Sequence, residues 1–438
     1  MDEVSLSMML ECRENRARTQ RELISMYGKP VVSFTMNIAG SVKTSHLIER
    51  GFSIGEERLL GALLCRKATI IHKRTNFFTT GPEGFFVVDM DPCRLKSICT
   101  WIEDMDPLGR LFDIDVIDVD GTKLERKDIR RCLLCNEQAK ICSSRRIHKV
   151  EDVWNRTNEI LTEAVLQHDS YVVASIAVKA LLFEVLTTPK PGLVDRRNNG
   201  SHKDMDLFTF SSSASILFPY FKKAYSLGWR SVDLKKCFAE LRELGKDAEH
   251  TMFFETNGVN THKGAIFSLG TVCCAAGFTA TNGGDIFQSC SLMTRGITEE
   301  LNGDSQMETN GKRLFSQYGL KGIRGELEDG LPSVRNIGLP MLEDCLKKGL
   351  SLEDAGSRVL IALVSQLSDT NMIARGGKEK ANEAMKMAAA LISSGSFGSS
   401  DIERLDEYFI SNNLSPGGSA DLLAVCFFLH FLKERFNA

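Results

Sequence analysis

The stretch EDVWNRTNEILTEAVLQHDS (residues 151–170) separates two parts of the chain that differ in hydrophobic periodicity. Before it, runs of β-branched and aromatic residues predict strands at 31–37, 84–90 and 109–118, and helical patterns occupy 5–26, 45–64 and 92–104. After it, apolar residues recur every three or four positions, which predicts helices. We therefore expect a multidomain chain, with an α/β or α+β domain at 1–168 and an all-α domain at 169–438.

The helices expected in the second part lie near 171–186, 206–227, 232–250, 262–278, 351–367, 378–393 and 420–434. The separating stretch fits either the terminal helix of the first domain or a helical linker into the second, so both alternatives stay open. Turn-rich segments lie between the expected helices. Loops at helix ends are where binding residues concentrate, so we look for function in these segments.

Composition limits the classes of protein to which the chain can belong. Its 438 residues carry a formal net charge of −3, which provides no global field for nucleic acid or for an anionic membrane. Thirteen cysteines, an odd number, and a start without an apolar signal region predict a reducing, cytoplasmic location. The longest uncharged stretch, 264–284, contains five glycines, so we expect a buried helix and no membrane span.

Two carboxylates in GRLFDIDVIDVDG (109–121) form a candidate catalytic pair. Asp113 and Asp115 are two apart on an expected strand and therefore lie on one face. Such a pair can hold Mg²⁺ against a polyphosphate, where the metal stabilises charge that develops on phosphorus. A solvated polar face of an edge strand explains the spacing equally well.

A basic segment follows this strand. Residues 123–149 contain nine Lys or Arg against three acidic residues, which suggests a surface for phosphate groups or for an acidic protein partner. Cys132, Cys135, Cys142 and His148 lie within it and are four ligands of the types that tetrahedral zinc accepts. Their spacing is not that of a common zinc finger, and buried thiols are the slightly preferred alternative.

The loop TPKPGLVDRRNNGSHKDMD (188–206) is the richest in charge in the second part. Its carboxylates could carry Mg²⁺ or act as a general base, and its cations could meet phosphates. The candidates for catalysis are Asp195, Asp204 and Asp206, and those for substrate binding are Lys190, Arg196, His202 and Lys203. The alternative is a surface loop with incidental charge.

Three glycine-containing segments at expected helix starts, together with a fourth segment, suggest a polyphosphate pocket. The three are TNGVNTHKG (256–264), DTNMIARGGKE (369–379) and SPGGSAD (415–421), and the fourth is YGLKGIRGELEDG (318–330). Free backbone N–H groups at a helix start, beside a cation, bind anions. The cations are Lys263, Arg324 and Arg375, the last followed by Gly376 and Gly377. A single such segment would be weak evidence, because glycines at helix ends are mostly structural.

These motifs together resemble two enzyme families joined in one chain. Residues from about 28 to 150, through GKPVVSFTMNIAG, TGPEGFF, PLGRLFDIDVID and RRCLLCNEQAKICSSRRIH, resemble the citrate lyase holo-acyl-carrier-protein synthase family. Residues from about 171 to 434, through TPKPGLVDRRNNGSHKDM, TNGVNTHKGAIFSLG, YGLKGIRGE, DTNMIARGG and NLSPGGSADLL, resemble triphosphoribosyl-dephospho-CoA synthase. The whole chain resembles a bifunctional fusion of the two.

The resemblance implies a two-step path that uses ATP, 3′-dephospho-CoA and the apo acyl carrier subunit of citrate lyase. The helical part would join ATP to dephospho-CoA with release of adenine. The first part, for which the Asp-x-Asp strand and the reaction type suggest a nucleotidyltransferase-like sheet, would transfer the phosphoribosyl-dephospho-CoA unit to a serine and release diphosphate. Asp113 and Asp115 match the family's aspartate pair, with Phe112 in place of Trp. The motif positions also include Asn260, His262, Asp369 and Asp421.

Two other functions remain open at this point. The same chemistry could serve malonate decarboxylase, whose synthase resembles the second part. A carrier-binding scaffold with a degenerate first domain is the other, and the retained Asp113 and Asp115 argue against it.

Overall fold

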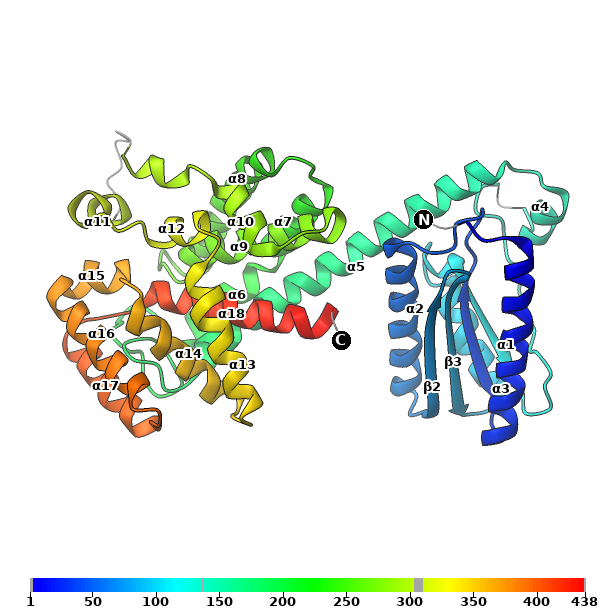
Figure 1. Ribbon diagram of the computed structural model, residues 1–438, viewed down its shortest axis with the longest axis horizontal. Coiled ribbons are helices and arrows are strands. Elements are labelled where there is room, and N and C mark those ends of the chain that lie inside the picture. Colours follow the sequence, from blue (N-terminus) through cyan, green and yellow to red (C-terminus); the bar gives the residue numbers. More distant parts are fainter. Residues whose placement is uncertain (1–2, 136, 303–309, 437–438) are drawn as a thin grey trace. The chain divides into compact units, whose positions relative to one another are not determined.

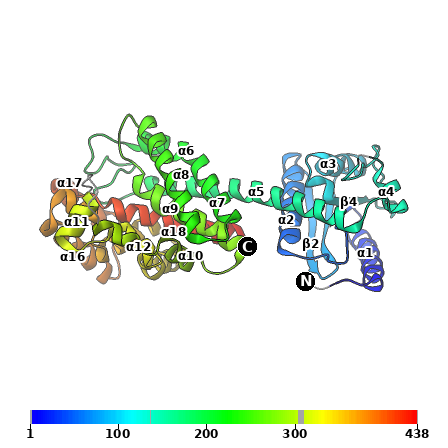
Figure 2. The ribbon, with the colours of Figure 1, turned by 90° about the horizontal axis from the view of Figure 1, so that it is seen from above.

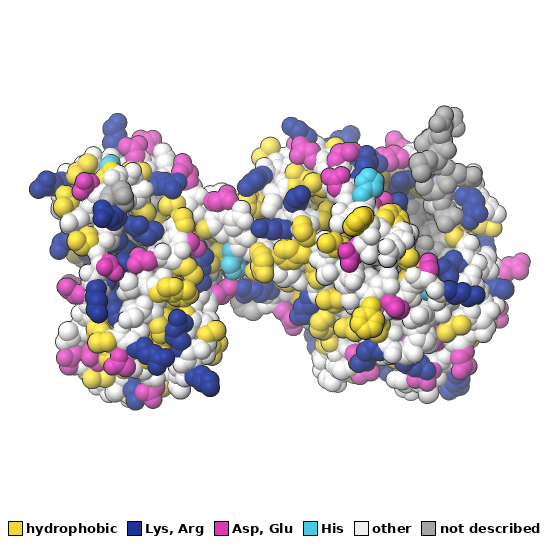
Figure 3. Space-filling view, turned by 180° about the vertical axis from the view of Figure 1, so that it is seen from behind, with side chains coloured by type: hydrophobic (Ala, Val, Ile, Leu, Met, Phe, Trp, Pro, Cys, Tyr) yellow, Lys and Arg dark blue, Asp and Glu magenta, His cyan; other side chains and the backbone are white. Residues whose placement is uncertain are grey.

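The computed structural model describes residues 3–135, 137–302 and 310–436. Its chain divides into two compact units, Met1–Asp169 and Ser170–Ala438, which we call the sheet unit and the helical unit (Figure 1). On the face drawn in Figure 3, Lys and Arg side chains are mixed with Asp and Glu side chains across both units, as a net charge near zero predicts.

The sheet unit is built on four antiparallel strands in the order β2-β3-β1-β4. The strands are β1 (Val31–Met36), β2 (Thr69–Phe78), β3 (Gly81–Asp89) and β4 (Phe112–Ile117). The three predicted strands are confirmed, although the last begins at Phe112 after a short 3₁₀ turn, Gly109–Leu111. The sequence analysis missed β2, an edge strand whose residues are all half-buried or exposed.

Helices cover both faces of this sheet. On one face, Leu23 of α1 (Leu6–Tyr27) packs against Val31, Phe85 and Val87. On the other face lie α2 (His46–Cys65) and α3 (Pro92–Asp104), and Phe52 of α2 stacks on Phe34 with ring centroids 4.4 Å apart. Together with α4 (Ala139–Arg145), which follows the sheet, this places a mixed sheet-and-helix unit before the helical one.

One helix, α5 (Val150–Leu186), contains the stretch 151–170 and continues into the helical unit. Its first part belongs to the sheet unit: Leu161 is buried close to Gly51 of α2, and Asp169 accepts hydrogen bonds from the Arg50 guanidinium at 2.7 and 3.0 Å. The stretch is thus the terminal helix of the first unit and also the continuous connection to the second.

Helices make up the helical unit throughout its described residues. They are α6 (Leu207–Ile216), α7 (Phe218–Arg230), α8 (Leu234–Glu255), α9 (Lys263–Asn282), α10 (Ile286–Thr294), α11 (Asn310–Tyr318), α12 (Gly322–Glu328), α13 (Leu339–Lys347), α14 (Leu352–Gln366), α15 (Thr370–Gly376), α16 (Lys378–Ser393), α17 (Ser399–Ser411) and α18 (Gly417–Phe436), with a 3₁₀ turn at Ile297–Asn302 and a π turn at Val334–Gly338. The single helix predicted at 206–227 is wrong: α6 and α7 divide there, and Pro219 lies in the first turn of α7.

Two long apolar helices, α9 and α18, form the centre of this unit (Figure 2). Glycines allow α7 to cross α9 closely, because a Cβ on Gly228 or Gly277 would overlap the opposing backbone. Within the described residues, α9 alone is long and apolar enough to cross a membrane, but 67% of that window is buried inside the unit. The first turns of α9 and α18 meet at a cavity of this unit.

Candidate functional site

A cavity of about 800 Å³ lies within the helical unit. Its walls come from the end of α5, the loop 187–206, α8, and the starts of α9, α12, α15 and α18. Nine of the residues predicted from the sequence line it: Lys190, His202, Asp204, Asn260, His262, Lys263, Arg324, Arg375 and Asp421. Residues that are up to 231 positions apart in the sequence therefore meet around one space large enough for a nucleotide.

A buried ion pair forms part of the cavity wall. The Lys190 ammonium donates to Glu184 Oε1 at 2.5 Å and to the Glu184 carbonyl oxygen at 2.8 Å, and both side chains are buried. The Lys190 backbone N–H donates to Asp195 at 2.9 Å. Separation of the two side chains would leave a buried charge uncompensated, which is costly. The pair therefore holds the end of α5, which carries Glu184, against the loop 187–206, which carries Lys190.

Asp421 lies in the first turn of α18, against the first turn of α9. A Cβ on Gly264 would overlap its Oδ2 atom, so the glycine makes room for the carboxyl. The residue is partly exposed to the cavity, but protein surrounds the carboxyl. Burial, with the negative charges of Glu184 and Asp369, raises the pKa of Asp421 well above its usual range, although the Ala265 N–H opposes this. A carboxyl of this kind can carry a proton near neutral pH.

Two histidines of the cavity are held in the neutral form. His262 is buried, and its Nδ1 hydrogen-bonds to Ser213 Oγ at 2.7 Å. Burial, with the positive charge of Lys190, lowers the pKa of His262 to about 3. Burial and the charge of Arg375 also lower the pKa of His202. One ring nitrogen of each, His262 Nε2 and His202 Nδ1, is buried without a partner among the described residues, so each can hydrogen-bond a neutral ligand group.

The three predicted cations differ in how they are held. Lys263 forms an ion pair with Glu249 at 2.8 Å. Arg375 donates to Asn413 Oδ1 at 2.9 Å and to the carbonyl oxygen of Ser201, which ties it to the loop 187–206. Arg324 is half-buried and has no partner among the described residues. Its guanidinium is therefore the cation of the three most available to an anionic ligand.

Other candidates have structural contacts and are not among the described residues that line the cavity. Asp195 accepts from the N–H groups of Lys190, Arg197 and Asn198, and so shapes the loop 187–206. Asp206 caps α6 through the Thr209 N–H at 2.8 Å.

Asp369 likewise caps the start of α15 and accepts from Ser419 N at 2.8 Å. Four further substrate-binding candidates do not line the cavity. Arg196 pairs with Glu353, and Lys203 is exposed. A Cβ on Gly376 would overlap Leu414, and Gly377 has a φ of +85°.

Sequence reasoning missed Glu184. It precedes the motif loop by four residues and lies inside the apolar run ALLFEVL (180–186). A lone carboxylate in such a run was the available signal, because a buried acid is costly unless it is paired or functional.

The sheet unit presents the second candidate site. Asp113 and Asp115 of β4 lie on one face, directly across from Thr35 and Ser33 of β1. Both carboxylates are half-buried. Lys123 Nζ lies 2.6 Å from Asp115 Oδ2, while Asp113 has no partner among the described residues. In the segment that follows, Cys132, Cys135, Cys142 and His148 come together.

Comparison with known proteins gives a match to each unit. A family model described as ATP:dephospho-CoA triphosphoribosyl transferase, CitG, matches residues 170–438. A second, described as apo-citrate lyase phosphoribosyl-dephospho-CoA transferase, CitX, matches residues 4–164. A protein of Haemophilus influenzae named Protein CitXG is 35% identical over 99% of this chain and 97% of its own length. The chain belongs to the CitXG family.

Among further relatives, one matches the whole chain and another matches about three fifths of it. Protein CitXG of Leuconostoc mesenteroides is 34% identical over 98% of this chain and 97% of its own length. A probable 2-(5″-triphosphoribosyl)-3′-dephosphocoenzyme-A synthase of Vibrio cholerae is 40% identical over 61% of this chain and 90% of its own length. In this chain, the CitG match contains the whole cavity, and the CitX match contains Asp113, Asp115 and the cysteine cluster.

Proposed function

We propose that the helical unit joins ATP to 3′-dephospho-CoA and that the sheet unit transfers the product to the citrate lyase acyl carrier subunit. In the first step, the 2′-oxygen of dephospho-CoA bonds to C1 of the ATP ribose as the bond from C1 to adenine breaks. The triphosphate stays on the product. In the second step, a serine hydroxyl of the carrier attacks the phosphorus next to the ribose, and diphosphate leaves.

One observation carries the first step: a single cavity contains a carboxyl with a raised pKa, Asp421, and a half-buried cation, Arg324. Glycosyl transfer through an oxocarbenium-like state needs a group that protonates the leaving base, a group that accepts the proton of the attacking hydroxyl, and a cation away from C1 that holds the triphosphate. Kinase-type phosphoryl transfer would need no group to protonate adenine. The cavity thus fits attack at carbon better than attack at phosphorus.

We assign the two proton transfers to two aspartates. Protonated Asp421 donates to a ring nitrogen of adenine as the C1 bond breaks, which makes adenine a neutral leaving group. Asp204, exposed at the cavity beside His202, accepts the proton of the attacking hydroxyl. Each aspartate then returns to its starting state by exchange with water. The Glu184 carboxylate, which pairs with Lys190, lies close enough to Asp421 to raise the pKa of Asp421. Its negative charge can also stabilise positive charge on the ribose.

The triphosphate cradle comprises Arg324 and Lys263, whose side chains line the same cavity. Charge-assisted hydrogen bonds from such cations suit phosphate oxygens.

We expect Arg324→Ala to raise the KM for ATP roughly 10- to 100-fold and to change kcat less, because a charge-assisted hydrogen bond contributes about 1.5–3 kcal/mol. Steady-state kinetics of adenine release measures both constants. Arg196→Ala is the matched control, since Arg196 pairs with Glu353 outside the cavity wall. An unchanged ATP KM in Arg324→Ala would exclude Arg324 from the cradle.

For the second step, we propose that Asp113 and Asp115 hold Mg²⁺ on the face of β4 that they share. The ion would neutralise the phosphates and the departing diphosphate, and it would replace Lys123 as the partner of Asp115. Ser33 and Thr35 place hydroxyls beside the pair. The paired aspartates on a strand and the reaction type support a nucleotidyltransferase-like fold, by analogy with other enzymes of this chemistry.

Separating the units tests this assignment of function. The sequence-based boundary, 1–168 and 169–438, removes Asp169 from Arg50, so we expect fragments 1–175 and 170–438 to be the more stable pair. With ATP and dephospho-CoA, the helical fragment should release adenine. The sheet fragment, given the purified intermediate, should add the prosthetic mass to apo-carrier. ADP or diphosphate from the helical fragment alone would contradict the proposal.

The same experiment addresses the other functions. A scaffold would add no mass to the carrier. The CitX match to residues 4–164, described for apo-citrate lyase, favours the citrate lyase carrier over that of malonate decarboxylase, and parallel incubation with both carriers compares them directly.

A further inference from the structure

The segment 118–149, between β4 and α5, lacks a hydrophobic core of its own. Of its described residues, Cys142 is the one that is buried. The only helix in this part of the described chain is the short α4. Conformational entropy opposes the ordering of such a segment, and small units without a core usually depend on a disulfide or a metal.

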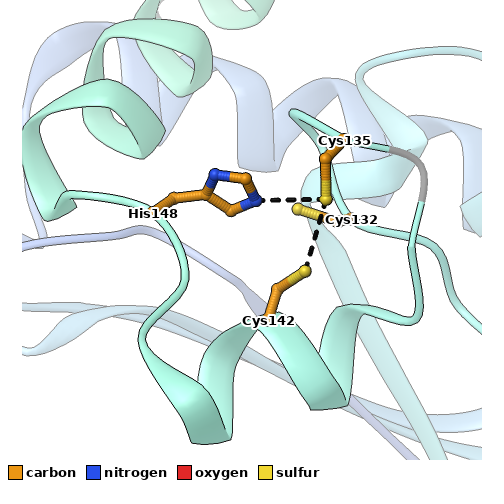
Figure 4. Close-up of side chains that lie close together, drawn as sticks. All are labelled: Cys132, Cys135, Cys142 and His148. Atoms are coloured by element: carbon orange, nitrogen blue, oxygen red, sulfur yellow. Dashed lines mark hydrogen bonds between the residues drawn. The ribbon is translucent and has the colours of Figure 1, made fainter.

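Arginines anchor the first part of this segment to the sheet unit. Arg126 pairs with Asp104 at 2.5 Å, and Arg130 lies 3.4 Å from Glu103 and donates to the Phe112 carbonyl oxygen. The part from Cys132 to His148 has a different organisation. Here the side chains converge on one another, as Figure 4 shows.

The convergence has the dimensions of a tetrahedral zinc site. Cys135 Sγ lies 3.4 Å from Cys142 Sγ and 3.1 Å from His148 Nε2. The ligand atoms of all four residues, Cys132 included, lie within 4.8 Å of one another. Zinc–sulfur bonds of about 2.3 Å at tetrahedral angles place sulfurs about 3.8 Å apart. Small shifts would therefore bring all four groups to one ion.

Exposure does not favour the alternative of buried structural thiols. Cys135 is exposed and Cys132 is half-buried, whereas Cys99, Cys273 and Cys426 elsewhere in the chain are fully buried. Thiols that contribute only packing are found inside a core. An exposed thiol within contact of a second thiol and an imidazole indicates a ligand set instead.

The surrounding charge also suits a metal–thiolate site. Three thiolates, one neutral imidazole and Zn²⁺ carry a net charge of −1. The neighbouring sequence provides Arg131, Lys140, Arg145, Arg146 and Lys149. Nearby cations favour the thiolate form, which is the form that binds metal.

We propose that Cys132, Cys135, Cys142 and His148 bind one structural zinc ion, which orders residues 132–148 and fixes the basic side chains of this segment beside β4. All four positions are occupied by protein, so the ion has a structural role and no open site for catalysis. This inference does not depend on the proposed reactions.

Metal analysis of the full chain, produced with added zinc and dialysed in reductant, tests the proposal. We expect about one zinc per chain in the wild type, and at least a tenfold loss in Cys135→Ser and in His148→Ala. Cys93→Ser is the matched control: this cysteine is also exposed but lies in the first turn of α3, and the variant should keep the metal. Zinc-free wild type, or full zinc in both ligand variants, would overturn the proposal.

Two further measurements do not depend on how well the variants fold. Cobalt-exchanged wild type should show thiolate-to-cobalt charge-transfer absorption, and its absence would overturn the site. Chelation should accelerate tryptic cleavage within 132–149 of the full chain, while the sites of the helical unit are cleaved at the same rate as before. A disulfide between Cys135 and Cys142, identified by peptide mapping of the metal-free chain, would also overturn it.

Discussion

Asp421→Asn should lower the rate of adenine release roughly 10²- to 10⁴-fold, with little change in the KM for ATP, as expected for the loss of a general acid. The amide has the shape of the carboxyl but no proton to donate to adenine. Single-turnover measurement of adenine from ATP and dephospho-CoA reports this step directly. A near-normal rate in this variant would show that another group protonates the leaving base.

The pH dependence adds a second measurement of the same role. Burial raises the pKa of Asp421, so the carboxyl stays protonated to a higher pH than an exposed aspartate would. Its acid role is then lost as the pH rises through that pKa, and adenine release should fall on the alkaline side. The residual rate of Asp421→Asn should lack this alkaline limb.

Asp206→Asn is the control for Asp421→Asn. Asparagine is as good an N-cap as aspartate, so the start of α6 should be retained. We expect nearly wild-type kinetics from this variant. A large loss of the rate of adenine release would indicate that Asp206 takes part in proton transfer.

Asp113→Asn and Asp115→Asn should each abolish transfer to the carrier while leaving adenine release intact. Losing a metal carboxylate from a phosphoryl-transfer site costs several kcal/mol, which corresponds to at least roughly a hundredfold in rate. Mass spectrometry of apo-carrier incubated with purified intermediate measures the transfer. Asp113→Asn should have the smaller effect on folding, because Asp115 also forms the ion pair with Lys123.

The control for this pair is Asp120→Asn, in the exposed turn after β4, where Asp120 accepts from the Thr122 N–H. Asparagine serves the same turn, so transfer should be unchanged. If Asp113→Asn and Asp115→Asn both transfer normally, the pair is only a polar strand face. Loss of adenine release in either variant would mean that the two activities are not separate.

Periodicity predicted the division of the chain and most long helices, because these elements bury one continuous face. It missed β2, whose half-buried edge residues carry little hydrophobic signal. It also missed α4, α10 to α13, α15 and α17, which are short or amphipathic over few turns. The continuity of α5 could not be predicted, since a polar helix face exposed to solvent resembles a linker in sequence.

Motif membership identified most of the residues around the cavity but not their division of labour. Asp195, Asp206 and Asp421 are all aspartates beside glycine-rich loops. Their contacts separate them: Asp195 and Asp206 accept hydrogen bonds from N–H groups close by in the sequence, whereas Asp421 packs against Gly264 near Glu184. Those neighbours come from distant parts of the chain, so local sequence carries no sign of the resulting pKa.

Strand β4, which carries Asp113 and Asp115, lies at an edge of the sheet, yet its outer backbone groups already have partners. Glu103 accepts from the Ile114 N–H at 2.8 Å, Lys96 donates to the Ile114 carbonyl oxygen at 2.9 Å, and Leu124 N–H donates to the Val116 carbonyl oxygen at 2.9 Å. An extended peptide therefore cannot add to this edge as a fifth strand. In the proposed transfer, the carrier's serine therefore reaches Asp113 and Asp115 without strand addition at β4, across the part of the sheet face that carries the two carboxylates.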